Sequence, residues 1–267
     1  MLPVITCTNL GQHGRLGNQL FQYALVKSVS IETGFPVQLP ELSNKVWHGQ
    51  RCLLPQLQIV YDPLVSPPTH TYLERTPNQF DAEVFSVEEG TNFMGYFQHP
   101  SYFDKHRDVF LKEFSTAQTI PDEATSILSN YTNPTSIHIR QGDYLPYAYP
   151  DYHKLVLEYI NHAVEDVGKD TDFLVFTGGS RKGNEYRDDD FQWCKENLVG
   201  DNFHFMEGNS ELLDFELIKK CTNNVTAWDS TFSWWASYLN ESRGKIYCNT
   251  EYQILPLYEH KQNWIII

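Results

Sequence analysis

The stretch that decides the fold is Ser136–Asp143, SIHIRQGD. Residues 136–140 form a short β-branched run, which predicts a strand, and the glycine at position 142 lets the chain turn sharply after it. Alternate residues of a strand share a face. His138 and Arg140 are therefore expected to point the same way, while the two isoleucines of the run enter the core.

Strands and helices alternate from this run to the end of the chain. We expect strands at 172–177, 202–206, 224–227 and 245–248, and helices at 151–167, 188–198, 211–221 and 231–239. Strict alternation predicts a parallel sheet with helices on both faces. Ligands bind such sheets outside the carboxyl ends of the strands, which lie here just after Arg140, Thr177, Met206 and Trp228.

The first part of the chain predicts a second α/β lobe. A strand is expected at 2–6, a glycine-rich loop at 11–17, a helix at 18–33 and another strand at 37–39. Gly34 suits the C-terminal cap of that helix. We therefore expect two lobes facing each other across a cleft, with residues 1–130 forming one lobe and residues 131–267 the other.

The charge of the chain limits its partners. The 267 residues carry a net charge of −14, whereas a nucleic-acid-binding protein normally has a basic face, so we expect no nucleic-acid partner. The field of an acidic protein also repels anionic ligands. Any such ligand must be held by a few well-placed positive groups.

Cysteine spacing and hydropathy indicate the compartment. The five cysteines are scattered without paired spacing, which is typical of reduced thiols in an intracellular protein. No apolar run approaches the ~20 residues of a membrane span, and the N-terminus does not have the pattern of a signal peptide. We expect a cytoplasmic or peripheral soluble protein, or a chain from which an anchor has been removed.

The sequence offers little for a metal ion. It contains no CxxC or HExxH pattern, and Asp188-Asp189-Asp190 suits the charged start of a helix better than a metal site. We therefore expect neither a metal nor a cofactor. The competing hypothesis, a metal-dependent transferase that uses this Asp-x-Asp run, is open to a test with a chelator.

Three junctions between elements have residues that suit an anion. In the first, the loop with Gly14 and Gly17 comes between a strand and a helix, where backbone N–H groups can approach a phosphate and Asn18 can point its amide at the ligand. The alternative is a plain tight turn with Asn18 as the helix cap.

The second junction is the end of the strand at 136–140. The planar guanidinium of Arg140 can grip two phosphate oxygens at once. Asp143 can orient Arg140 or His138, or touch the substrate. The alternative is a surface Arg–Asp pair of little consequence.

The third junction is the start of the helix at 231–239. The hydroxyls of Ser230 and Thr231, together with the first N–H groups of the helix, form an anion site, and Phe232 can stack on a base. The alternative is an ordinary capped helix of the core. Taken together, the three junctions indicate a nucleotide or nucleotide-sugar ligand.

Four segments of the sequence resemble the α-1,2-fucosyltransferases of glycosyltransferase family 11. They are Gly14–Ala24 (GRLGNQLFQYA), His138–Tyr144 (HIRQGDY), Ser230–Leu239 (STFSWWASYL) and the D-x-x-L-I-x-x-C pattern of residues 214–221. The matches occur in order and span nearly the whole chain.

This resemblance implies a GT-B fold, with two Rossmann-like lobes across a cleft, the N-terminal one on the acceptor side and the C-terminal one binding GDP-fucose. It implies an inverting enzyme that needs no metal and moves L-fucose to a glycan hydroxyl, the 2-hydroxyl of a galactose-like sugar. The alternatives are an enzyme like the peptide O-fucosyltransferases and a non-catalytic module that binds the GDP-sugar or a glycan.

The resemblance also implies roles for residues. Arg140 is expected to bind the pyrophosphate and His138 the nearby donor, while Gly17 and Asn18 contact the donor from the other lobe. Asp214 is expected to read guanine N1 and N2, with phosphate and base held by Ser230, Thr231 and Phe232. This chain has Asp229 where the family often has asparagine, and a second negative charge beside a pyrophosphate would weaken binding.

The general base and the acceptor site remain open at this point. Asp143 and His13 are the candidates for a base, and an enzyme without a protein base is the third possibility. Aromatic rings suit sugar faces, so Tyr144 and Tyr147 are expected to contact the acceptor together with His13. The sequence names neither the acceptor sugar nor the oligomeric state.

Overall fold

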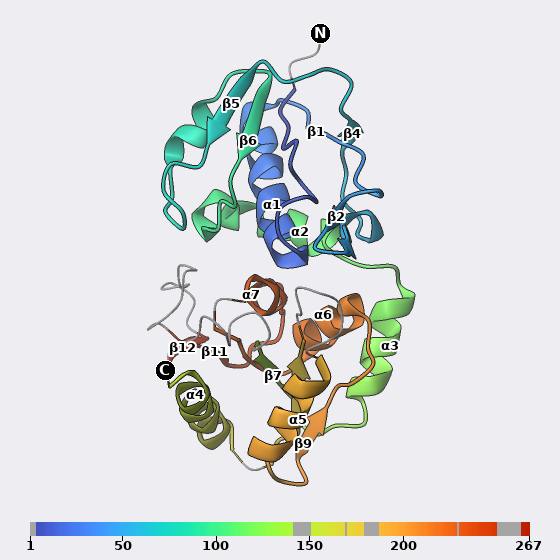
Figure 1. The fold of residues 1–267 in the computed structure, drawn as a ribbon, viewed down its shortest axis with the longest axis vertical. Helices are drawn as coiled ribbons and strands as arrows, with labels where there is room; N and C mark the ends of the chain where they lie inside the picture. Colours follow the sequence, from blue (N-terminus) through green and yellow to red (C-terminus); the bar gives the residue numbers. More distant parts are fainter. Residues whose placement is uncertain (1–3, 141–150, 169, 179–186, 229, 250–262) are drawn as a thin grey trace. The chain divides into compact units, whose positions relative to one another are not determined.

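The computed structural model describes residues 4–140, 151–168, 170–178, 187–228, 230–249 and 263–267 (Figure 1). The chain divides into two compact units, the first ending at Ala117 and the second beginning at Gln118. Helix α3 (Thr119–Leu128) belongs to the second unit and packs against helix α6 (Glu211–Lys220). The expected division at residue 130 lies after α3.

The second unit contains a parallel sheet of the strand order expected for a doubly wound fold. Its strands are β7 (Thr135–Ile139), β8 (Phe173–Thr177), β9 (Phe203–Phe205), β10 (Asn223–Val225), β11 (Ile246–Cys248) and β12 (Trp264–Ile266). They lie in the order β12-β11-β10-β7-β8-β9, and each neighbouring pair is parallel. The chain therefore winds outward from β7 on one side and then returns to begin the other side with β10.

The alternation predicted from the sequence is confirmed in this unit. Besides α3 and α6, its helices are α4 (Tyr152–Val167), α5 (Arg187–Asn197) and α7 (Thr231–Tyr238). Their ends and those of the strands fall within two residues of the expected bounds. Strand β12 was not predicted. The buried side of α4 is formed by Tyr152, Val156, Tyr159, Ile160 and Ala163.

The two faces of the sheet are covered by different helices. Ile137 and Ile139 pack with residues of α4 and α5, whereas the alternate residue His138 contacts Phe232 of α7. Both faces of β7 are buried, as is usual for the central strand of a parallel sheet. The expected alternation of this strand is therefore confirmed: the isoleucines enter one core layer and His138 faces the other side.

A buried polar network joins β7 and β10 on the α6 side. The side-chain amide of Asn224 donates to Ser136 Oγ (2.7 Å) and to the carbonyl oxygen of Ile218 (2.7 Å). Its own oxygen accepts a hydrogen bond from Asn240 (2.7 Å). Asn224 is only 1% exposed. Buried polar groups of this kind are favourable only while they are all paired.

The first unit is also built on short parallel strands. Strand β1 (Gln38–Leu39) pairs with β4 (Asp62–Pro63), and β5 (His70–Leu73) pairs with β6 (Thr91–Met94). Isolated bridges from Ile5 to Val37 and from Thr6 to Asn92 join the two pairs into one parallel array. The strand expected at 2–6 is thus present only as these two bridges, and residues 1–3 lie outside the described part of the chain.

A hairpin and several short helices complete the first unit. The hairpin consists of β2 (Val46–Trp47) and β3 (Gln50–Arg51), joined through His48 and Gly49, which both have positive φ (48° and 80°). Positive φ at both central residues is the pattern of the tightest hairpin turns. The short helices are α2 (Arg107–Glu113) and the 3-10 turns Leu54–Gln56, Ala82–Ser86, Pro100–Tyr102 and Asp104–His106.

Helix α1 (Leu16–Thr33) is the long helix of the first unit (Figure 1) and contacts the 3-10 turns at 54–56, 82–86 and 100–102. It is buried on almost every side over its first four turns. Gly34 caps its C-terminus in the left-handed conformation (φ 76°), as predicted. The expected start at Asn18 is wrong, because the helix begins at Leu16 and Asn18 lies inside its first turn, where it cannot be the cap. None of the helices in the described ranges is both long and apolar enough to cross a membrane.

We expect Asn224→Ala to destabilise the protein by about 3 kcal/mol, because Ser136 and Asn240 lose buried partners. The change is measured by urea unfolding followed by circular dichroism. Asn161→Ala is the matched control, since Asn161 is exposed on α4 and its loss is expected to change stability by less than about 0.5 kcal/mol. Equal unfolding midpoints for the two variants would contradict the role given to this network.

Candidate functional site

The switch in winding direction brings two strand ends together. Strands β7 and β10 are adjacent and in register, with Ile137 beside Val225. A crevice outside the carboxyl ends of the strands forms where the strand order reverses, and ligands bind there in doubly wound folds. In this sheet that place lies between Arg140, which directly follows β7, and the segment that leads from β10 into α7.

His138 and Arg140 are the residues that β7 brings to this edge. His138 is 8% exposed and lies in the strand itself. Arg140 is half-buried, and its backbone carbonyl accepts a hydrogen bond from the Tyr152 hydroxyl at the start of α4. The end of β7 is thereby tied to the helix that follows it in the sequence.

The start of α7 is the second part of the site. Ser230 is its N-cap, and the Ser230 hydroxyl oxygen accepts a hydrogen bond from the Ser233 N–H (3.4 Å). Thr231 and Phe232 occupy the first turn and are half-buried. First-turn N–H groups have no acceptor inside the helix and favour an anion. The Ser230 side chain is engaged in capping, which sets the direction of these N–H groups.

Phe232 links the start of α7 to the neighbouring elements. Its ring centroid lies 5.7 Å from that of His138 and 5.4 Å from that of Phe215 in α6. The structure therefore brings together two residues, His138 and Phe232, that the sequence placed 94 positions apart as separate candidates. Phe215 and Phe232 pack edge to face, with 64° between their ring planes.

Asp214 lies in the first turn of α6, next to Phe215. It is 8% exposed, and one of its carboxylate oxygens accepts a hydrogen bond from the Asn209 amide (2.9 Å). Ser210 caps the helix by accepting from the Leu213 N–H (3.2 Å). A carboxylate at a helix N-terminus is favoured by the helix dipole. Asp214 directly precedes Phe215, whose ring contacts Phe232.

The glycine-rich loop of the first unit is shaped around Asn18. Gly14 has a φ of 83°, and a Cβ atom at this position would come within 2.3 Å of Asn18 Nδ2. No other residue fits here without displacing the amide. The Gly14 carbonyl accepts from Gln19 Nε2 (3.0 Å), and Gly17 is buried in the first turn of α1. Asn18 Oδ1 accepts from Gln98 Nε2 (2.9 Å).

His13 lies in a group of aromatic rings beside this loop. The exposed His13 ring stacks on Tyr96 (centroids 5.4 Å apart, 27° between planes) and lies 5.2 Å from the Trp47 ring. Trp47 and Tyr96 were not predicted, because the stretch 39–100 offered no periodic pattern to place them. Their signal in the sequence is only that each aromatic residue stands near the end of a short apolar run.

Some expected residues lie outside the described part of the chain. They are Asp143, Tyr144, Tyr147 and Asp229. Of the three aspartates at 188–190, Asp190 is a buried residue of α5. Across the described ranges, no three His, Cys, Asp or Glu side chains gather in positions that could hold a metal ion.

All five cysteines are buried and free. Burial raises the pKa of the Cys7, Cys194 and Cys248 thiols to about 12 and that of Cys52 to about 11, and it raises the pKa of Cys221 further. The thiolate is the reactive form of cysteine. None of these side chains is therefore suited to act as a nucleophile near neutral pH.

A doubly wound sheet whose switch point carries an arginine and a helix N-terminus is an arrangement by which α/β proteins bind nucleotides. The chain belongs to glycosyl transferase family 11, whose family model matches residues 7–265. It is a glycosyltransferase of that family, as the four sequence segments indicated.

Its relatives include bacterial and animal enzymes. The O-antigen biosynthesis glycosyltransferase WbnK of Escherichia coli is 26% identical over 87% of this chain and 90% of its own length. An alpha-1,2-colitosyltransferase of the same species is 27% identical over 85% of each chain. The galactoside alpha-(1,2)-fucosyltransferase 2 of Hylobates lar is 26% identical over 85% of this chain and 67% of its own.

Solved structures of two fucosyltransferases share the fold. The fucosyltransferase NodZ from Bradyrhizobium has a TM-score of 0.57 at 12% identity, covering 89% of this chain and 93% of its own. POFUT1 in complex with GDP has a TM-score of 0.50 at 13% identity, covering 91% and 95%. The expected α/β class with a parallel sheet is thereby confirmed.

The burial of the thiols predicts their reactivity. At neutral pH we expect no fast reaction of the native protein with a thiol reagent such as DTNB, since the thiolate fraction at these raised pKa values is negligible. In denaturant without reductant, all five thiols should react. A single thiol that reacts rapidly in the native protein, or a count of three after denaturation, would contradict this description.

Proposed function

We propose that this glycosyltransferase moves L-fucose from GDP-fucose to the 2-hydroxyl of a galactose-like sugar in a glycan, with inversion at the fucose anomeric carbon. The observation that carries the proposal is the pairing of β7 with β10, which places Arg140 and the start of α7 at one sheet edge. The similarity to enzymes named for α-1,2 transfer supports the linkage.

Arg140 is proposed to bind the pyrophosphate of the donor. The net charge of −14 repels an anion, so binding depends on local groups that outweigh the general field. A guanidinium offers two parallel hydrogen bonds and a permanent charge. The first N–H groups of α7 add a second favourable contact with the phosphates. His138, Ser230 and Thr231 complete this part of the donor site.

Phe232 and Asp214 are proposed to recognise the guanine. A flat ring beside His138 and Phe215 offers a surface on which a base can stack. Guanine presents donors at N1 and N2, and a carboxylate can accept from both. The hydrogen bond from Asn209 orients the Asp214 carboxylate for this purpose.

The first unit is proposed to close the donor site from the other side of a cleft between the two lobes. Asn18 supplies a side-chain amide, and Gly14 and Gly17 allow the backbone to approach the donor. This contribution rests on the loop geometry within the first unit, where the Asn18 amide lies directly over Gly14.

The reaction is a single displacement. The acceptor oxygen forms a bond to the anomeric carbon as the bond to the β-phosphate oxygen breaks, and GDP leaves with the electron pair. Because GDP-fucose is β-linked, the product is α-linked. Negative charge grows on the departing phosphate, and Arg140 stabilises it without a metal ion. The acceptor proton passes to a base, for which His13 and Asp143 remain the candidates.

The ring cluster of His13, Trp47 and Tyr96 is proposed to bind the acceptor sugar. His13 follows the bridge at Thr6, Trp47 lies in β2 after β1, and Tyr96 follows β6. Thr6, β1 and β6 all belong to the parallel array of the first unit. Aromatic rings pack well against the apolar face of a hexose. The cluster is close to the donor-binding loop, because His13 directly precedes Gly14. Tyr144 and Tyr147 remain further candidates for this contact.

Colitose is the second donor sugar to consider, because one relative is a colitosyltransferase. Colitose is fucose without its 3-hydroxyl. A site that hydrogen-bonds the 3-hydroxyl discriminates strongly against the deoxy sugar, whereas an apolar site does not. Comparison of GDP-fucose with GDP-colitose therefore separates the two possibilities.

The proposal is tested by offering the purified enzyme GDP-fucose and GDP-colitose with galactose-containing acceptors, in excess EDTA. We expect transfer from GDP-fucose that survives the chelator, with an α-1,2 product by NMR. Arg140→Ala should lower kcat about 100–1000-fold, since one stabilising donor is lost at the leaving group. Arg243→Ala, an exposed arginine of the same unit, is the matched control and should be fully active.

Three results of this experiment would overturn parts of the proposal. Transfer from GDP-colitose alone would change the donor, and loss of activity in EDTA would show a metal requirement. Near-normal turnover of Arg140→Ala would remove the proposed role of this guanidinium.

The acceptor site has its own test. Trp47→Ala is expected to raise KM for the acceptor about tenfold, because a stacking surface worth about 1–1.5 kcal/mol is lost. KM for GDP-fucose should stay unchanged. Phe80→Ala, which removes a partly exposed ring elsewhere in the first unit, is the control. An acceptor KM equal to that of the unmodified enzyme would exclude Trp47 from the acceptor site.

A further inference from the structure

A strained turn follows β6 in the first unit. Gly95 has a φ of 154° and Phe97 a φ of 52°. A bulky residue at positive φ is an uncommon conformation that costs of order 1–3 kcal/mol and persists only where the surroundings hold it. The turn leads directly to Gln98, the residue that donates to Asn18.

Contacts from two sides hold this turn. The Glu74 carboxylate accepts hydrogen bonds from the N–H groups of Tyr96 (2.7 Å) and Phe97 (3.0 Å). From α1, Gln22 Nε2 donates to the Gly95 carbonyl (2.9 Å). A Cβ atom at Gly95 would come within 2.4 Å of Glu74 Cβ, so the two backbones approach as closely as glycine allows.

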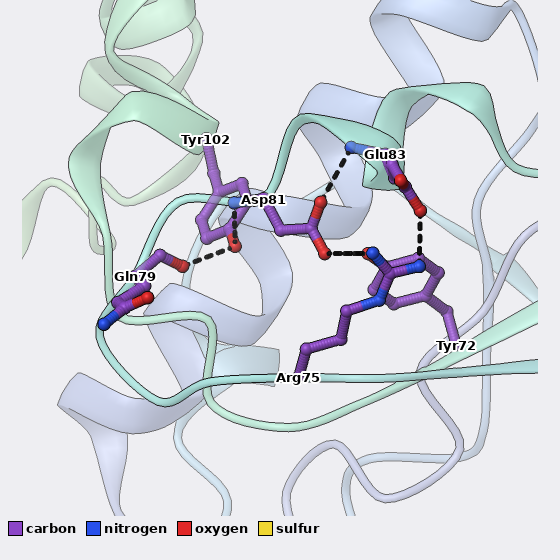
Figure 2. A network of polar contacts seen from close by, with 6 residues as sticks. All are labelled: Tyr72, Arg75, Gln79, Asp81, Glu83 and Tyr102. Atoms are coloured by element: carbon purple, nitrogen blue, oxygen red, sulfur yellow. Dashed lines mark hydrogen bonds and ion pairs between the residues drawn. The ribbon is translucent and has the colours of Figure 1, made fainter.

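The residues that flank Glu74 in the sequence belong to a network of polar contacts at the end of β5 (Figure 2). Tyr72 donates to the Asp81 carboxylate (2.5 Å), and Arg75 forms ion pairs with Asp81 (3.4 Å) and with Glu83. The Tyr102 hydroxyl accepts from the Asp81 N–H (2.9 Å). Tyr72, two residues before Glu74, and Arg75, directly after it, thus both contact Asp81.

The turn determines which way the Asn18 amide faces. Gln98 is 9% exposed, and its Nε2 donates to Asn18 Oδ1 over 2.9 Å. An amide group has an acceptor side and a donor side. With the oxygen directed at Gln98, the Nδ2 side is directed to Gly14, where no Cβ obstructs it. If the Asn18 amide alone were reversed, its N–H groups would face the N–H groups of Gln98.

We propose that Gln98 is a positioning residue, which fixes the Asn18 amide with its N–H groups toward the phosphates of the donor. The Glu74-bound turn keeps Gln98 in place for this task. The inference rests on the proposed donor role of Asn18 in fucosyl transfer. It also gives a reason for the strained conformation of Phe97: the turn places the buried Gln98 side chain so that it donates to the oxygen of the Asn18 amide.

The test combines Gln98→Glu with Asn18→Ala. A glutamate keeps the shape but accepts instead of donating, so it draws the Asn18 N–H groups toward itself. Gln98→Glu is expected to lower kcat/KM for GDP-fucose roughly 10–100-fold, the loss of one hydrogen bond to a charged group. KM for the acceptor should change by less than about twofold. In the Asn18→Ala background, Gln98→Glu should cause no further loss.

Two additional variants complete the design. Gln98→Met removes the donor without adding charge and serves if the glutamate variant does not fold; its loss of kcat/KM should be smaller but should also vanish in the Asn18→Ala background. Gln56→Glu adds the same charge at an exposed glutamine of the first unit and should leave the rate unchanged.

A second readout does not depend on transfer. The side-chain ¹⁵N–¹H signals of Asn18 report its amide in the free protein, and they should shift in Gln98→Glu and stay in place in Gln56→Glu. If the unmodified enzyme transfers no fucose, the proposed function fails while these signals still decide the amide orientation. The inference is overturned if the signals are unchanged, or if Gln98→Glu lowers the rate equally with and without Asn18.

Discussion

The pairing of β7 with β10 is the constraint on which the rest of the second unit depends. Two strands that lie 88 positions apart in the sequence become neighbours, and their buried side chains fix the register through Asn224 and Ser136. One strand delivers His138 and Arg140 to the sheet edge, and the other leads into the start of α7. Neither group suffices alone, since a single guanidinium or a single helix start is a weak anion site.

An acidic protein that binds an anion needs positive groups at the binding site that outweigh its overall negative charge. Here the local part has two origins, a guanidinium at a strand end and the main-chain N–H groups at the start of α7. The helix contribution adds no titratable group, so it remains constant over a wide pH range. The guanidinium of arginine likewise carries a permanent positive charge in proteins. The proposed site therefore combines two positive contributions that do not depend on protonation.

The second unit could be predicted from the sequence nearly element by element, whereas the first could not. Strands such as β7 carry apolar residues at strand spacing and end in turn residues, so local pattern and fold agree. In the first unit, pairs such as β1 and β4 are two residues long, too short for any periodic signal. Strand β12 was missed because a short edge strand owes its place to main-chain pairing with β11. Trp47 and Tyr96 come from distant parts of the sequence and contact His13 only in the folded first unit. Asn18 resembled a helix cap in the sequence because asparagine favours the cap position.

The long separation between the central strands also has a bearing on how the protein comes to be folded. Folding rates fall as the mean sequence separation of native contacts rises, because a long loop must close before its contacts form. In the second unit β7 emerges from the ribosome well before β10 and waits for its central neighbour until most of the unit has been synthesised. During that interval the edge of β7 that pairs with β10 has no partner, and unpaired strand edges of this kind favour aggregation and make the nascent chain a natural client for chaperones.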